Sequence, residues 1–109
     1  MATTYKVLGQ SNPSATTATT LYTVPAATQT VVSTISVCNQ AGSAATFRIA
    51  VRPAGASLAA QHYIVYGATV PASDSTMITV GLTLAATDVV TVYASSANLS
   101  FNAYGSEIA

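Results

Sequence analysis

The sequence predicts an all-β protein, because its apolar residues recur with a period of two along most of the chain. Helical spacing of apolar residues does not occur in it. Short stretches rich in Gly, Pro, Asn and Ser separate the alternating runs at close intervals, as turns do. Together these observations indicate about eight short strands in a single antiparallel two-sheet sandwich, of the jelly-roll or immunoglobulin-like kind.

The first predicted strand is Tyr5 to Leu8, within a segment that is otherwise rich in Ser, Thr and Ala. Residues 1–20 carry few large apolar groups, so they contribute little to a core of their own. We therefore expect them to form an extended N-terminal arm that adds a strand to a neighbouring sheet edge. Its anchors would be Tyr5, Val7 and Leu8, with Lys6 on the opposite face.

The next runs are Thr20 to Val24 and Val31 to Cys38, and the clearest run of all is Thr46 to Arg52. The later ones are His62 to Tyr66, Met77 to Leu82, Val89 to Tyr93 and Asn98 to Tyr104. Alternation gives each strand a buried face and a wet face. In the run from Val31 to Cys38, the inward face consists of Val31, Ile35 and Val37. The predicted core is Phe47, Ile49, Val51, Ile35, Val37, Leu99 and Phe101.

Two corners of the chain resemble each other. Thr23-Val24-Pro25-Ala26 and Thr69-Val70-Pro71-Ala72 each follow a predicted strand and precede another. Proline ends ladder pairing at its own position, so the chain can cross between sheets there. Asp74 and Asp88 lie in turns before strands, where an Asp side chain commonly accepts hydrogen bonds from nearby backbone N–H groups.

The chain has 109 residues, enough for one domain that spans residues 1–109. Only 6% of residues are charged, against about 25% in ordinary globular chains, and the formal net charge is zero. Such a chain has no field with which to hold nucleic acid or an anionic membrane. A surface of about 5,600 Å² would carry roughly one charge per 900 Å², so a large interface can be nearly free of charge.

We find no pattern typical of an enzyme, a cofactor site or a metal site. His62 is the only histidine and Cys38 the only cysteine, which gives too few ligands for zinc and excludes an internal disulfide. Cys38 lies in the most apolar run, where a small buried hydrophobe is the simpler interpretation than a nucleophile paired with His62. The start of the chain lacks the pattern of a signal peptide, and we expect synthesis in a reducing cytoplasm.

Two other groups of residues have both a structural and a functional interpretation. Arg48 and Arg52 lie four residues apart on the outward face of one strand. They form either a solvated face or a grip on the carboxylates of a neighbouring subunit. Tyrosines in strands are usually packing residues, but they also form platforms on which sugars stack. The six tyrosines are Tyr5, Tyr22, Tyr63, Tyr66, Tyr93 and Tyr104.

The chain resembles small virion proteins of tailed bacteriophages, including cyanophages, over almost its whole length. The segments that carry the resemblance are Leu21-Tyr22-Thr23-Val24-Pro25-Ala26, Val31-Val32-Ser33-Thr34-Ile35-Ser36-Val37-Cys38-Asn39, Ala45-Thr46-Phe47-Arg48-Ile49-Ala50-Val51, Gln61-His62-Tyr63, Leu84-Ala85-Ala86-Thr87-Asp88-Val89-Val90 and Phe101-Asn102-Ala103-Tyr104-Gly105-Ser106-Glu107-Ile108. The resemblance implies a structural role and brings no catalytic residues with it.

The resemblance and the composition together predict a capsid cement or decoration protein in the virion. It would bind the major capsid protein or other virion proteins and associate with itself, as a trimer. Contacts would come from Tyr5, Val7 and Leu8 of the arm and from Arg48 and Arg52. The alternatives are a tail, baseplate or fibre-associated structural protein and a carbohydrate-binding receptor module.

Overall fold

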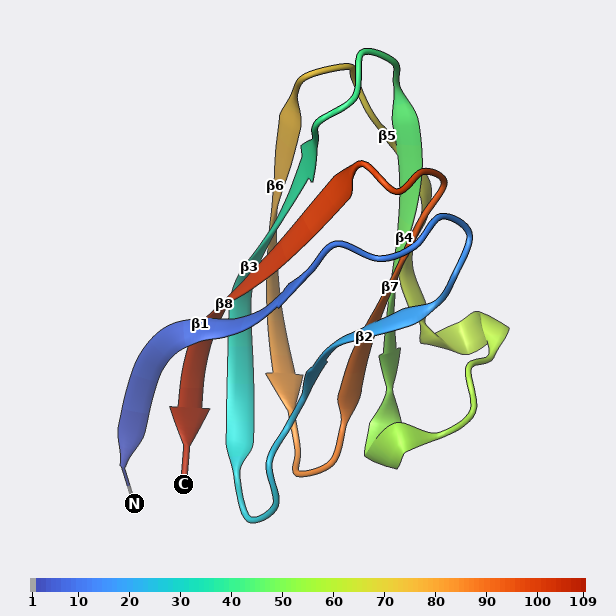
Figure 1. The fold of residues 1–109 in the computed structure, drawn as a ribbon. Coiled ribbons are helices and arrows are strands. Elements are labelled where there is room, and N and C mark those ends of the chain that lie inside the picture. Colours follow the sequence, from blue (N-terminus) through green and yellow to red (C-terminus); the bar gives the residue numbers. More distant parts are fainter. Residues whose placement is uncertain (1) are drawn as a thin grey trace.

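A computed structural model describes residues 2–109 as two antiparallel sheets packed face to face (Figure 1). The strands are β1 (Thr3–Ser11), β2 (Thr19–Thr23), β3 (Gln29–Asn39), β4 (Ala45–Arg52), β5 (Tyr63–Val70), β6 (Ser75–Leu84), β7 (Val89–Ala94) and β8 (Leu99–Ile108). Two short 3-10 helices, η1 (Pro53–Gly55) and η2 (Ala60–His62), lie between β4 and β5. Across residues 2–109, no helix has the length and apolar character needed to cross a membrane. The predicted all-β sandwich is confirmed.

The strands pair in a nested order. β1 pairs with β8, β2 with β7, β3 with β6 and β4 with β5, all antiparallel. Sheet A has the order β1-β8-β3-β6, and sheet B has the order β2-β7-β4-β5. Of the two expected topologies, this is the jelly roll, in which a long antiparallel hairpin rolls up into two sheets. The two ends of the chain consequently lie side by side (Figure 1).

The core lies between the two sheets and forms from the inward phases of their strands. Phe47 of sheet B meets Phe101 of sheet A edge to face, with ring centroids 6.0 Å apart. Six of the seven predicted core residues are buried: Phe47, Ile49, Ile35, Val37, Leu99 and Phe101. Val51, the next-to-last residue of β4, is only half-buried and packs against this core.

The predicted inward phase of β3 is wrong at its start. Val32 is buried there, whereas Val31 is half-exposed. The register with β8 shifts between Val32 and Thr34, so Ser33 is an extra residue in a β-bulge. One extra residue reverses the alternation, which moves Val31 to the outer face.

The N-terminal segment does not extend away from the domain as an arm. β1 is the edge strand of sheet A and pairs with β8 along most of its length. Leu8 packs against the core, and the backbones of Ala2 and Ala109 exchange two hydrogen bonds. Backbone pairing holds this strand in place, and a composition poor in apolar side chains does not reveal it.

The two Val-Pro-Ala corners are true corners between the sheets. Val24, directly after β2, and Val70, the last residue of β5, are both buried, and in each case the next strand belongs to sheet A. Two residues after each proline, the backbone takes a left-handed conformation, at Ala27 (φ 55°) and at Ser73 (φ 53°). The repeated sequence therefore encodes a repeated turn.

Gly9 allows the edge strands of the two sheets to approach each other. A Cβ atom at Gly9 would collide with the backbone carbonyl oxygen of Leu21 in β2. Gly9 follows a register shift in β1, so the strand bends toward sheet B at this point. Because Gly9 has no side chain, β1 and β2 can lie in contact on this side of the sandwich.

Truncation of either core phenylalanine should destabilise the fold strongly. We expect Phe47→Ala and Phe101→Ala each to lower the free energy of unfolding by about 3 to 5 kcal/mol, because each leaves a cavity between the sheets. Denaturant titration measures the change. An unchanged midpoint in both variants would contradict the packing described above.

A second stability prediction compares two glycines. Gly9→Ala should cost about 1 to 3 kcal/mol, because β1 and β2 would have to separate. Gly42→Ala is the matched control, since a Cβ atom there meets nothing within 4 Å. Equal denaturant midpoints for the two variants would show that β1 and β2 do not approach closely.

Candidate functional site

The outer face of sheet B carries a row of three stacked side chains. Arg48 on β4 is paired directly with Tyr66 on β5 and with Tyr93 on β7. The guanidinium carbon of Arg48 lies 4.2 Å from the ring centroid of Tyr66 and 4.3 Å from that of Tyr93. Both contacts are cation–π interactions, so Arg48 holds the two rings in place.

A fourth member of this face, Tyr63, joins the row through a β-bulge. Tyr63 and Tyr66 are three residues apart, and a regular strand would point them to opposite faces. The register with β4 shifts between Ile49 and Ala50, which leaves Ile64 as an extra residue. The two tyrosine rings therefore meet edge to face, 4.9 Å apart at their centroids.

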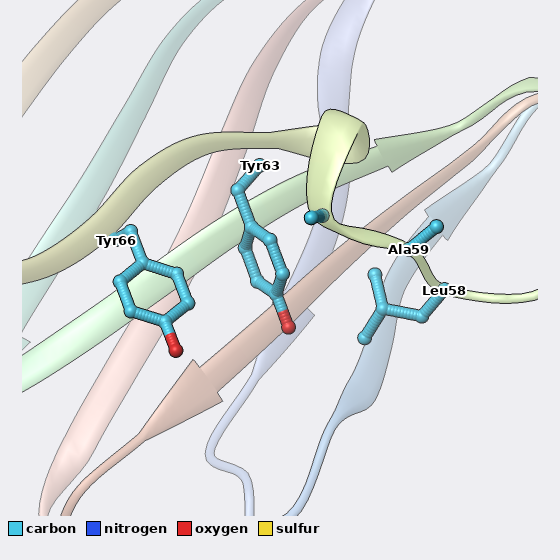
Figure 2. Close-up of a pocket in the computed structure, with 5 residues that line it drawn as sticks. Leu58, Ala59, Tyr63 and Tyr66 are labelled. Carbon is cyan, nitrogen blue, oxygen red and sulfur yellow. The ribbon is translucent and has the colours of Figure 1, made fainter.

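The tyrosines form one wall of a cleft (Figure 2). The opposite wall comes from Leu58, Ala59 and Ala60, in the connection that carries η1 and η2. The cleft has a volume of about 630 Å³, which is in the range of sites for small ligands. Figure 2 shows Tyr63 and Tyr66 side by side on the same wall, with Leu58 on the other side of the cleft.

The structure places the five predicted contact residues in different settings. Arg48 is held between two tyrosines, and Arg52 donates hydrogen bonds to Thr91 and to two carbonyl groups after β4. Tyr5 and Val7 lie on the outer face of sheet A with 83% and 48% of their surfaces exposed, whereas Leu8 packs inward. The two arginines therefore have roles within the domain.

Cys38 and His62, which a cysteine nucleophile would require together, belong to different parts of the fold. Cys38 lies on β3 of sheet A and is half-buried, whereas the sequence predicts a buried side chain. The difference arises because β3 points Cys38 to the outer face of the sheet. His62 ends η2, and its Nδ1 accepts a hydrogen bond from the backbone N–H of Ala59. In the described part of the chain, no three His, Cys, Asp or Glu side chains gather as metal ligands would.

Both aspartates bind backbone groups, as the sequence predicts. Asp74 accepts a hydrogen bond from the N–H of Ser75. Asp88 accepts from Ala54 at 2.8 Å and from Ala85 at 2.9 Å. Asp88 therefore joins the turn before β7 to the connection that forms one wall of the cleft.

A polar group that the sequence does not reveal connects the two sheets beside β1. The buried Tyr22 hydroxyl of β2 donates to the carboxylate of Glu107 on β8 and bonds to Thr30. Lys6 of β1 forms an ion pair with the same carboxylate, at 3.0 Å. Burial, and then the hydrogen bond to Glu107, raise the pKa of Tyr22 to about 12. The hydrogen bond from Tyr22, followed by the one from Lys6, lowers the pKa of Glu107 below its usual value.

The tyrosine row is the part of this face that sequence reasoning missed. The alternation of β4 does predict that Arg48 faces outward, and tyrosines flank it on both neighbouring strands. Their side-by-side placement depends on strand pairing, which periodicity alone does not determine. No protein-family model and no curated protein matches this sequence. We therefore infer function from the cleft, the exposed faces and the placement of the charges.

The contacts of Glu107 with Tyr22 and Lys6 should make the free energy of unfolding depend on pH in the acid range. Because the pKa of Glu107 is lowered in the folded protein, its contribution is present above the unfolded pKa and is lost as pH falls below about 4. We expect Glu107→Gln to reduce the slope of unfolding free energy against pH in this window. Denaturant titrations at pH 7, 4 and 3 measure it. Equal slopes in the two proteins would contradict the role of the carboxylate.

Proposed function

We propose that this protein is a structural component of a bacteriophage virion, a capsid cement or decoration protein that bridges capsomers and stabilises the shell. The resemblance of the sequence to small virion proteins motivates the proposal. The jelly roll is a fold that viral capsid proteins use, which supports the proposal by analogy alone. The observation that carries it is the distribution of charge on the surface.

All six charged side chains have a partner within the domain. The pairs and contacts are Lys6 with Glu107, Arg48 with Tyr66 and Tyr93, Arg52 with Thr91, Asp74 with the backbone of Ser75, and Asp88 with the backbones of Ala54 and Ala85. The accessible surface is 5368 Å², and outside these six residues it consists of apolar and aromatic groups, hydroxyls, amides and the single histidine. A partner can therefore cover a large part of this surface while desolvating few charges.

The outer face of sheet A supplies apolar groups for such a contact. Tyr5, Val7, Met77 and Tyr104 are all exposed there, and Val7 is paired directly with Tyr104. Exposed aromatic and Met side chains are typical of interface centres. Tyr5 and Val7 thus keep the contact role expected from the sequence, but as part of an integral edge strand.

The β6 edge of the same sheet is open to pairing. Ser75–Leu84 contains no proline and no charged residue, although natural edge strands commonly carry both to prevent pairing with other chains. A partner strand would gain backbone hydrogen bonds along Ser75–Thr79, before the bulge at Val80 and Gly81, and would cover the half-buried Ile78. We infer that the protein forms a trimer in which such contacts close a ring on the shell.

Imaging of virions tests the location. We expect cryo-microscopy of the phage that encodes this chain to show jelly-roll density at symmetry-related positions on the capsid, in groups of three. Sedimentation of the purified protein at micromolar concentration should give the mass of a trimer. Density confined to the tail or baseplate would support the alternative assignment, and absence of the protein from virions would exclude both.

Charges placed on the β6 side of sheet A should prevent assembly and leave the fold intact. Met77 and Thr79 are exposed on β6, so Met77→Lys with Thr79→Lys should lower occupancy on purified shells at least about tenfold, with little change in melting temperature. The control adds two lysines at Ser14 and Ala15, both exposed in the β1–β2 loop. Equal occupancy for the two double variants would exclude this face from the contact.

A further inference from the structure

The connection between β4 and β5 is longer than the pairing of these strands requires. Ala50 and Tyr63 are directly paired neighbours in antiparallel strands, and two residues suffice to join such strands. Here η1, η2 and the residues around them intervene, and no residue of η1 or η2 is buried. A long connection that adds nothing to the core is typical of a binding loop.

Side-chain hydrogen bonds hold this connection in one shape. Arg52 donates to the carbonyl groups of Gly55 and Ala56, the latter at 2.9 Å. Asp88 accepts from the N–H of Ala54, and His62 accepts from the N–H of Ala59. Two of the six charged side chains of the protein therefore fix one loop, and that loop places Leu58 opposite the tyrosines.

The opposite wall is equally fixed. The Arg48 guanidinium stacks on Tyr66, and Tyr63 meets Tyr66 with an angle of 87° between the rings. Tyr66 nevertheless leaves 66% of its surface exposed. Rings that are held in place but remain accessible lose little conformational entropy when a ligand binds.

The lining determines the chemistry of the ligand. Leu58, Ala59, Ala60, Tyr63 and Tyr66 carry no charge, and the nearby Arg48 is covered by two rings. None of these five lining residues offers a counter-charge to a phosphate or carboxylate. Each tyrosine combines an apolar ring with a hydroxyl at its tip, so the fitting ligand has an apolar face bordered by hydroxyl groups.

A pyranose ring has this character, with C–H groups on one face and hydroxyls around its edge. We propose that the cleft between residues 58–60 and the tyrosine pair Tyr63 and Tyr66 binds a neutral saccharide. The sugar ring packs on the tyrosine wall and under Leu58, while its hydroxyls bond to the phenol groups. The proposal is independent of virion assembly, because it concerns the outer face of sheet B and is tested on the isolated protein.

The test uses an array of neutral glucose, galactose and mannose oligosaccharides, with sialylated and sulfated glycans and proline-rich peptides as comparators. We expect saturable binding to at least one neutral glycan, confirmed by calorimetric titration with that oligosaccharide. Tyr63→Ala and Tyr66→Ala should each weaken its affinity at least about tenfold. Tyr5→Ala, which removes an exposed tyrosine from sheet A, is the matched control and should leave the affinity unchanged.

A loop variant covers the case in which truncation of a β5 tyrosine disturbs the sheet. Leu58 is exposed and lies outside the strands, so Leu58→Asp should weaken binding at an unchanged melting temperature. Tyr66→Phe should keep part of the affinity, because the ring remains and only the hydroxyl is lost. Binding of charged glycans or peptides alone, no glycan binding at millimolar concentration, or equal affinity in wild type and Leu58→Asp would each overturn the proposal.

Discussion

The pairing of the first strand with the last is the constraint on which the rest of the structure depends. β1 and β8 meet from Thr3↔Ile108 to Ser11↔Phe101, and every other strand pair is nested inside this one. Closing the outermost pair requires the ends of the chain to meet, which costs loop-closure entropy before any contact repays it. Sandwiches of this kind accordingly fold on the order of milliseconds to seconds.

The same pairing creates the place where the two sheets meet. β1 bends toward β2 at Gly9, and the space beside it holds Tyr22, Thr30 and Glu107. A buried polar group of this kind is stable only when each member is satisfied, and no buried side-chain polar atom within residues 2–109 lacks a hydrogen-bond partner. Two of the six charged side chains, Lys6 and Glu107, thus lie where the two sheets meet, and two others, Arg52 and Asp88, fix the connection between β4 and β5.

Much of the fold could be predicted from the sequence, because alternation and turn residues act locally. The inward phases of β4 and β8 were predictable from Phe47, Ile49, Leu99 and Phe101. The wrong phase of Val31 arises at the bulge around Ser33. A second bulge, at Ile64, brings Tyr63 beside Tyr66, which alternation does not predict. A bulge is set by the register between strands, which a single run of residues does not contain.

The candidate site depends on this non-local register more than the core does. Arg48 was predictable as an outward residue, but its two ring partners come from β5 and β7, which lie on either side of β4 in the sheet although far apart in sequence. The N-terminal strand illustrates the same limit, because hydrogen bonds to β8 hold it despite its polar composition. A single sequence therefore predicts properties that depend on the pattern of side chains along one strand, but not properties that depend on which strands pair and in which register.

The two outer faces differ in a way that suits two separate contacts. Sheet A presents Tyr5, Val7, Met77 and Tyr104 and a β6 edge without proline or charged residues. Sheet B presents a cleft whose second wall is a loop held by hydrogen bonds. The first surface is broad and rich in exposed apolar side chains, which favours a large protein partner, and the second is concave, which favours a small ligand. Because the sheets lie back to back, a partner that covers sheet A leaves the tyrosine cleft of sheet B facing outward.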